Sequence, residues 1–222
     1  MGHVFGIDLG TTYSCIAYID EYGRPEVLKN SEGNRTTPSV VMIRPTQDVV
    51  VGEEAKRSVE IEPEQVIQFI KRKMGREDDK VTVNGGSYSA PEISAYILKK
   101  LVQDANAELR QSGVLKEGEE VRDVVITCPA YFGMNERQAT KTAGELAGLN
   151  VLNIINEPTA AAISYGALSK GRDETVLIYD LGGGTFDITV MNVHKNDITV
   201  ICTGGDDQLG GKNWDEALMD YV

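Results

Sequence analysis

Two glycine-rich segments carry the residue types that hold phosphate. They are Gly10-Thr11-Thr12 and Gly182-Gly183-Gly184-Thr185, and each follows an Asp-Leu pair. Glycine lets a backbone approach a ligand closely and turn successive N–H groups toward it, which suits an anion such as phosphate. One such segment alone is more simply read as a tight hairpin turn. Two equivalent copies favour a phosphate site.

Asp8 and Asp180 stand two residues before these glycines, at equivalent positions. Either aspartate alone could simply cap a turn. Beside phosphate, however, a carboxylate needs a cation between the two negative groups, and Mg²⁺ typically takes few carboxylates together with phosphate oxygens and several waters. The pair therefore predicts a Mg²⁺ site. The chain contains neither G-x-x-x-x-G-K-[ST] nor G-x-G-x-x-G followed by a helix, so the turns would grip phosphate without a helix N-terminus.

Lys71 and Glu157 are further candidates, and each has a plain structural alternative. Lys71 falls in a helix predicted over residues 63–74, at the margin of its apolar face. It could reach inward, or it could complement the C-terminal end of that helix. Glu157 precedes Pro158 near a predicted helix N-terminus, where a carboxylate is favoured in its ionised form. It could therefore be an ordinary helix cap.

Composition excludes several classes of function. The 222 residues include 22 basic and 34 acidic side chains, a formal net charge of −12, which is poorly suited to nucleic acids or acidic membranes. No apolar run approaches the roughly 20 residues that cross a bilayer, and the N-terminus does not resemble a secretory signal. Two histidines leave little room for histidine-based catalysis or zinc binding. Cys15, Cys128 and Cys202 match no metal or redox spacing and are predicted to be buried.

An internal repeat organises the elements that must position these residues. Residues 4–19 and 177–191 each read as an apolar strand, Asp-Leu-Gly, small residues with a threonine, and a β-branched strand. A turn cluster and a third short strand follow each copy, at residues 25–28 and 198–202. The sequence therefore predicts a duplicated unit of three strands.

Helices are predicted between the two copies. Residues 89–92 have the spacing of a capping box, and apolar residues then recur every four positions until Gly113. A second helix is expected over residues 135–148, and an Ala-rich third over 159–168 after an apolar strand at 151–155. Strands that alternate with helices indicate an α/β fold.

The stretch from residue 38 to 96 is more loosely built. Short strands are expected around residues 39–43 and 80–83, with the helix over 63–74 between them. We interpret this stretch as a subdomain inserted into the first unit. A hinge could lie at residues 169–174.

Six motifs together resemble the ATPase domain of the seventy-kilodalton heat-shock chaperones, the DnaK type. In chain order they cover residues 6–14, 34–39, 129–132, 137–141, 154–162 and 180–187. The resemblance extends over essentially the whole chain. It implies an α/β, actin-like ATPase fold built on a duplicated ribonuclease-H-like sheet unit, with the first lobe complete and the second lobe truncated.

The resemblance also implies a division into three parts. The first-lobe core, subdomain IA, would be residues 1–37 with 97–170, and the inserted subdomain IB would be residues 38–96. Residues 171–222 would begin the second lobe, subdomain IIA. The family's ATPase domain continues past Val222 into most of the adenosine pocket, so these 222 residues alone are expected to bind ATP weakly and to hydrolyse little of it.

By the same resemblance, the two glycine segments bind ATP or ADP. The implied nucleotide-binding residues are Gly10, Thr11, Thr12, Tyr13, Gly182, Gly183, Gly184 and Thr185. Asp8 and Asp180 would hold Mg²⁺ through water.

The implied catalytic residues are Lys71, Glu157, Asp187 and Thr185. Lys71 would contact the transferred phosphate and the attacking water, while Glu157 and Asp187 would position that water or accept its proton. Such a set fits phosphoryl transfer by positioning and charge stabilisation.

Pro129 and Arg137 match residues that relay the nucleotide state to a substrate domain in this family. Two departures from the family pattern, Asn153 and the pair Gly133-Met134, fall on the surface that the family uses for co-chaperone or linker contact.

The implied function is that of a cytoplasmic molecular chaperone, in which ATP hydrolysis controls the binding of unfolded polypeptides by a domain absent from this chain. A J-type co-chaperone and a nucleotide-exchange factor would be its partners, with no role for nucleic acid or membrane. Two alternatives share the duplicated turns: an actin-like filament-forming protein and a nucleotide-sensing scaffold that no longer turns over.

Overall fold

The structure of the chain, a computed structural model, describes residues 3–168, 173–194 and 197–221. The chain divides into two units. The first unit is Met1–Ile126 with Met134–Ile154, and the second unit is Thr127–Gly133 with Ile155–Val222. The predicted lobe boundary between residues 170 and 171, and most of the predicted hinge, lie outside the described residues. The predicted three-part division stays a prediction.

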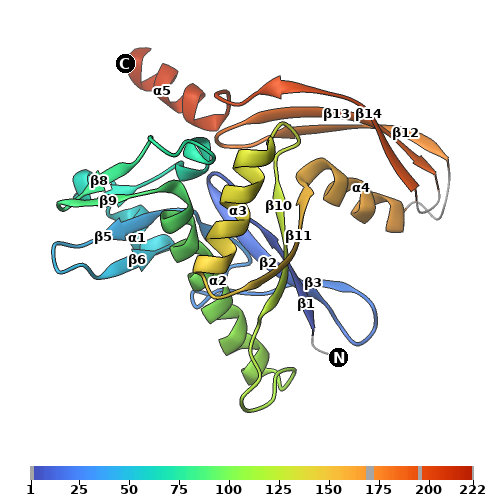
Figure 1. The fold of residues 1–222 in the computed structure, drawn as a ribbon, viewed down its shortest axis with the longest axis horizontal. Coiled ribbons are helices and arrows are strands. Elements are labelled where there is room, and N and C mark those ends of the chain that lie inside the picture. The colour runs from blue at the N-terminus through green and yellow to red at the C-terminus, as the bar shows by residue number, and fades with distance from the viewer. Residues whose placement is uncertain (1–2, 169–172, 195–196, 222) are drawn as a thin grey trace. The chain divides into compact units, whose positions relative to one another are not determined.

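Alternating apolar residues build the central sheet of the first unit (Figure 1). In β1 (Val4–Asp8), Phe5 and Ile7 are buried and the residues between them are exposed, because successive side chains of a strand point to opposite faces. The same alternation continues through β2 (Tyr13–Ile19) and β10 (Asp123–Cys128). These strands therefore present one apolar face to the core.

The sheet has the strand order β11-β10-β1-β2-β3, with β4 also paired to β2. Its other strands are β3 (Pro25–Val27), β4 (Thr37–Pro38) and β11 (Asn150–Asn156). β1 runs antiparallel to β2 and parallel to β10. The first predicted three-strand unit is thus confirmed, and the Asp8 end of β1 leads directly into the predicted phosphate turn.

Two helices support this sheet. They are α2 (Ala90–Gln111) and α3 (Met134–Leu146), and α2 packs against both α3 and β2. Ile93, Ile97 and Leu101 are buried along one stripe of α2, as their spacing predicted. The helix begins at the expected capping box, in which the Ser89 amide and hydroxyl both donate to Glu92 Oε2, at 2.8 and 2.7 Å.

The inserted region consists of short elements. They are β5 (Val41–Ile43), β6 (Val49–Val51), α1 (Glu53–Arg57), β7 (Val66–Ile67), β8 (Val81–Val83) and β9 (Gly86–Tyr88). β5 lies between β6 and β7 in one small sheet, and β8 and β9 form a hairpin. Val40, Met42 and Ala55 form the apolar core of this region.

The predicted helix over residues 63–74 is wrong. The segment forms a 3₁₀ turn η1 (Pro63–Gln65), the strand β7, and a second 3₁₀ turn η2 (Ile70–Lys73). Pairing of β7 with β5 draws the chain into an extended form, and Phe69 then adopts a left-handed conformation with φ 55°, which no continuous helix allows. Tertiary pairing has overridden a helix-like spacing of apolar residues, which are buried all the same.

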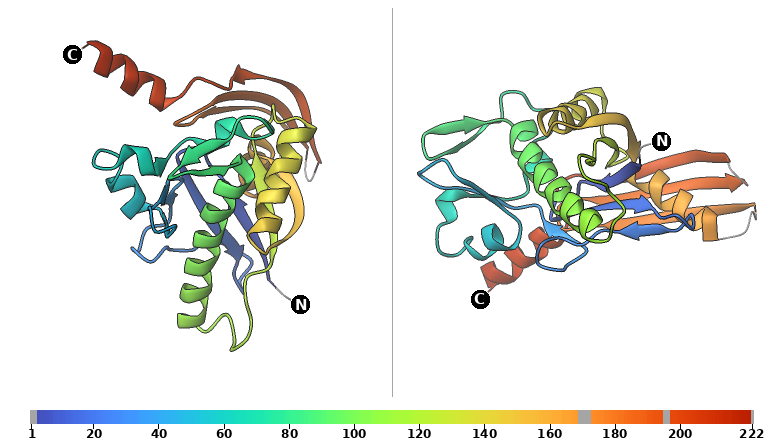
Figure 2. Two further views of the ribbon diagram at one scale, coloured as in Figure 1. Left: turned by 60° about the vertical axis from the view of Figure 1, so that its left-hand side comes forward. Right: turned by 90° about the horizontal axis from the view of Figure 1, so that it is seen from below.

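The second unit repeats the three-strand pattern. β12 (Glu174–Leu181), β13 (Phe186–His194) and β14 (Asp197–Asp206) form an antiparallel sheet in that order. The helix α4 (Glu157–Leu168) packs against this sheet (Figure 2), where Ala162 meets Met191 and Val193 in a buried cluster. A last helix, α5 (Gly211–Tyr221), follows β14. The duplicated unit is therefore confirmed, with a longer third strand than predicted.

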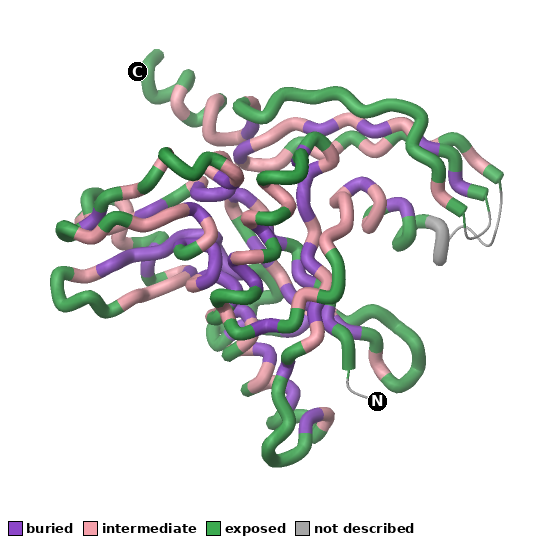
Figure 3. Tube along the Cα trace, in the orientation of Figure 1, coloured by how far each residue is buried: buried purple, intermediate pink, exposed green. Residues whose placement is uncertain are grey.

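Exposure differs sharply along this second sheet. β14 is exposed over most of its length, whereas β13 is buried at alternate positions (Figure 3). Among the cysteines, Cys128 is buried and Cys15 is half-buried, but Cys202 on β14 is exposed. The expected burial of Cys202 is wrong because, in the described residues, β14 is an edge strand of its sheet. No helix among the described residues has both the length and the apolar character to cross a membrane.

Ser89→Ala is expected to destabilise the chain by about 1 kcal/mol, since it removes the N-terminal cap of the longest helix. Urea unfolding measures the change in the free energy of unfolding. Ser87→Ala, an exposed serine on β9, is the matched control and is expected to have little effect. Equal losses from both substitutions would contradict a role for the cap.

The same cap carries a pH dependence. Hydrogen bonds from Ser89 hold the pKa of Glu92 below its ordinary value of 4.5. A carboxylate whose pKa is lowered by folding stabilises the native state above its unfolded pKa, and that stability is lost as the pH falls through its folded pKa. The stability difference between wild type and Ser89→Ala is therefore expected at pH 7 and should shrink below about pH 4. A difference that is independent of pH would contradict this coupling.

Candidate functional site

The first glycine segment forms the turn between β1 and β2. The Ser39 amide donates to the Thr12 carbonyl at 2.8 Å, which fixes one side of the turn. Within the described part of the chain, the amides of Thr11 and Thr12 have no acceptor in the protein, and the buried Thr12 hydroxyl oxygen has no partner either. Consecutive N–H groups of this kind form a concavity that suits an anion. The turn can therefore take a phosphate group.

Gly10 is required in this turn by a close approach of the backbone to itself. A Cβ atom placed on Gly10 would lie 2.0 Å from the Tyr13 carbonyl oxygen, far inside any tolerable contact. Any side chain at this position would force the turn open. Tyr13 begins β2 at the end of the turn, and its ring carries the Lys56 ammonium group over its face at 4.7 Å.

The second glycine segment forms the equivalent turn between β12 and β13. The Gly182 amide donates to the Thr185 carbonyl at 2.9 Å, which closes the hairpin. The Gly182 and Gly183 carbonyls accept the amides of Gly211 and Lys212, at 3.1 and 3.0 Å, so the first residues of α5 support the turn from behind.

Gly210 makes this support possible, and the sequence analysis missed it. A Cβ atom on Gly210 would lie 2.6 Å from the Gly183 carbonyl carbon and 2.6 Å from the Gly184 nitrogen. The signal in the sequence was the pair Gly210-Gly211 directly before a helix-forming stretch, which is where a backbone can pack closely on another backbone.

A pair of carboxylates flanks the second turn. Asp180 at the end of β12 lies directly opposite Asp187 on β13, and Asp187 is only 5% exposed. Like charges placed opposite each other on an antiparallel pair destabilise the sheet. A divalent cation near these carboxylates would relieve that repulsion, so the donor set fits Mg²⁺ with phosphate and water as its other ligands. Among the described residues, three side chains of the metal-binding types do not gather at any one point.

The first unit differs at the equivalent place. Asp8 is paired in register with Cys15, where the second unit has Asp187. Burial, and then the nearby Asp8 carboxylate, raise the pKa of the Cys15 thiol above its ordinary value. The thiol therefore stays protonated at neutral pH, so the first unit has one carboxylate at the place where the second unit has two.

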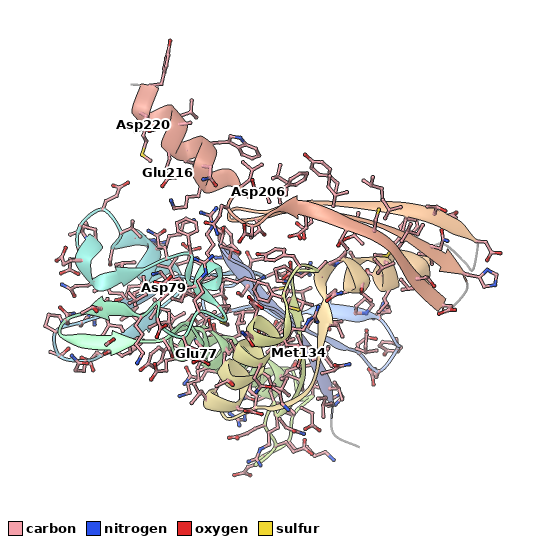
Figure 4. The ribbon with its side chains drawn as sticks, turned by 45° about the horizontal axis from the view of Figure 1, so that its top comes forward. Glu77, Asp79, Met134, Asp206, Glu216 and Asp220 are labelled. Carbon is pink, nitrogen blue, oxygen red and sulfur yellow. The ribbon has the colours of Figure 1, made fainter. Side chains whose placement is uncertain are left out.

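Lys71 lies in η2 and not on an α-helix. Its side chain is buried, with 7% exposed, which is rare for a lysine without a specific polar surrounding. Lys73, the next lysine along the chain, forms an ion pair with Asp79, which Figure 4 labels. The low exposure of Lys71 agrees with the inward position that the sequence left open for it.

Glu157 is the first residue of α4, as its place before Pro158 predicted. It is half-buried at a helix N-terminus, where the helix dipole favours the ionised carboxylate. Glu157 and Asp187 belong to the same unit. Their elements, α4 and β13, pack against each other.

Asp187 also lines a pocket of about 500 Å³ in the second unit. The other lining residues are Tyr131, Thr203, Gly204, Gly205, Asp206 and Asp207, and Figure 4 shows Asp206 where β14 ends. Gly205 has φ 149°, and a Cβ there would lie 2.1 Å from the Phe186 carbonyl oxygen. The backbones of β13 and β14 therefore approach each other closely at this side of the pocket. This side of the pocket was not predicted, because β14 continues to Asp206 whereas the predicted strand ends at residue 202.

The two predicted relay residues fall in different units. Pro129 is buried in the segment Thr127–Gly133, and its carbonyl accepts the Phe132 amide at 3.2 Å. Arg137 lies half-buried on α3 and lines a shallow groove with Met134 and Asn153. Met134, labelled in Figure 4, is 88% exposed at the start of α3.

The chain matches known proteins over nearly its whole length. The family model described as "Hsp70 protein" matches residues 4–222. The chaperone protein DnaK of Thermotoga maritima is 51% identical over 219 residues, and DnaK of Thermosipho africanus is 50% identical over 220 residues. In each case the match covers 99% of this chain and 35% of the relative, so the chain spans about a third of the length of these relatives.

These matches agree with what each unit contains: a glycine turn that is entered from an aspartate and joins two antiparallel strands. The chain belongs to the Hsp70 family, and that membership implies the actin-like ATPase fold.

Proposed function

We propose that this chain is the nucleotide-binding part of a chaperone that binds and hydrolyses ATP with Mg²⁺. The single observation that carries the proposal is the pair of equivalent turns, each built on glycine and each entered from an aspartate. Membership of the Hsp70 family and the DnaK name of the relatives support the chaperone function over a filament-forming or scaffold protein. The extents of the two lobes remain part of this proposal.

Both turns bind phosphate in this proposal. The Thr11, Thr12 and Gly183 amides bind phosphate oxygens, because these N–H groups have no acceptor within the described part of the protein. Tyr13, Gly184 and Thr185 complete the two phosphate segments, and Mg²⁺ bound beside Asp8 and Asp180 would neutralise charge on the phosphates.

The catalytic roles follow from burial and charge. Lys71 brings a buried positive charge to the transferred phosphate, where it stabilises the charge that develops in the transition state. Glu157 and Asp187 orient the attacking water and take up its proton, since both side chains carry a carboxyl group and lie on elements of one unit that pack together. Catalysis of phosphoryl transfer needs only such positioning and charge stabilisation.

The proposal also includes coupling to other proteins. Pro129 and Arg137 would relay the nucleotide state to a polypeptide-binding domain, and unfolded polypeptides would be the clients. A J-type co-chaperone, a nucleotide-exchange factor and a cytoplasmic location, all expected from the sequence, stay predictions. Asn153 and Met134 line the same groove as Arg137, so the two departures from the family pattern bear on that coupling.

Lys71→Ala is expected to lower the rate of ATP hydrolysis by at least about a hundredfold in the hydrolytically active protein, and to change nucleotide affinity by less than about threefold. Single-turnover hydrolysis and a binding titration measure the two quantities. Lys73→Ala is the matched control, because this neighbouring lysine pairs with Asp79. If Lys71→Ala and Lys73→Ala hydrolyse ATP at the same rate, Lys71 has no catalytic role.

Gly210→Ala is expected to weaken the binding of Mg-ADP at least about tenfold, since the added Cβ must displace the backbone of the second phosphate turn. Chemical-shift titration of the ¹⁵N-labelled chain detects even weak binding. Gly6→Ala is the control, because a Cβ on Gly6 has no atom within 4 Å. Equal affinities of the two variants would remove the second turn from the nucleotide site.

A further inference from the structure

Two buried serines lie beside the first turn. Ser14, on β2, is 1% exposed, and Ser39, just after β4, is 2% exposed. Their hydroxyl oxygens are 2.9 Å apart although the residues are 25 positions apart in the sequence. Buried hydroxyl groups are nearly always hydrogen-bonded, and both serines have such partners in the first turn.

The bonds form a closed ring that begins and ends at Gly10. The Gly10 amide donates to Ser14 Oγ at 3.2 Å, and Ser39 Oγ donates to the Gly10 carbonyl at 2.8 Å. Each hydroxyl has a single proton. Because the Ser39 proton is used on the Gly10 carbonyl, the Ser14 proton must point to Ser39 Oγ. The direction of every bond in the ring is thereby fixed.

The ring holds the backbone of the turn from the side of the inserted region. Thr37 of β4 is paired in register with Ser14, and the Asn30 side chain donates to the Thr37 hydroxyl at 3.3 Å. The Ser39 amide donates to the Thr12 carbonyl as well. Ser39 thus contacts the turn on both sides of the Thr11 and Thr12 amides, which are the groups left for a ligand.

We propose that Ser14 and Ser39 are positioning residues for phosphate binding. The inference rests on the proposed function: the ring fixes the peptide planes of the turn so that the Thr11 and Thr12 amides stay aimed at a phosphate before it binds. Neither serine touches the phosphate. The hydrogen bonds of a ring reinforce one another, so removal of either hydroxyl breaks the ring and frees the peptide planes of the turn.

The test is a double-mutant cycle read by nucleotide affinity. Ser14→Ala, Ser39→Ala and the double variant are each titrated with Mg-ADP by chemical-shift perturbation of the ¹⁵N-labelled chain. Each single variant is expected to bind about tenfold more weakly, and the double variant about as weakly as either single one, since the second substitution removes nothing that still acts. The Thr11 and Thr12 amide signals are expected to shift in all three variants before nucleotide is added.

Ser94→Ala is the matched control. Ser94 is also 1% exposed, lies on α2, and has no hydrogen bond to the turn, so its loss can lower the melting temperature without changing affinity. Wild-type affinity in Ser39→Ala, or a double variant whose loss equals the product of the two single losses, would overturn the inference. If Mg-ADP shifts no amide signal of the wild-type chain, the proposed nucleotide-binding function itself is contradicted.

Discussion

The close approach of one backbone to another is the constraint on which the rest of this structure depends. At Gly10 the backbone lies close to the Tyr13 carbonyl oxygen. At Gly210 the backbone just before α5 packs on the backbone of the second turn. Neither position has room for a Cβ atom. Because the backbones are this close, their N–H groups can serve as the ligand-binding surface, and the side chains around them need only hold the peptide planes and balance the charge.

The two copies share three antiparallel strands and a glycine turn but differ in chemistry. Both units enter their turn from an aspartate at the end of a strand, yet the neighbour opposite that aspartate is Cys15 in one unit and Asp187 in the other. The supports also differ, since two serines and the Ser39 amide hold the first turn, while the amides that open α5 hold the second. The repeated scaffold therefore differs in charge: one carboxylate stands at the entrance of the first turn, and two stand opposite each other beside the second.

Most of the strands and helices could be predicted because their signals are local. Apolar runs that end in Asp-Leu-Gly marked β1 and β12, and the capping box at Ser89 marked the start of α2. The helix expected over residues 63–74 failed because pairing of β7 with a distant strand decided the backbone there, and spacing alone cannot reveal a partner. The site residues on the turns carried their own signal in glycine and aspartate. Gly210 carried none that pointed to the second turn, since its role depends on packing against residues nearly thirty positions earlier.

The helix α5 has one more consequence, which concerns local opening. None of its described residues is buried, so little apolar contact opposes its fraying, and regions of this kind unfold locally at small cost. Each such event would release the carbonyls of Gly182 and Gly183, while the serine-bound turn keeps its shape. Amide hydrogen exchange in α5 would therefore report how firmly the second turn is held, separately from the turn that the two serines hold.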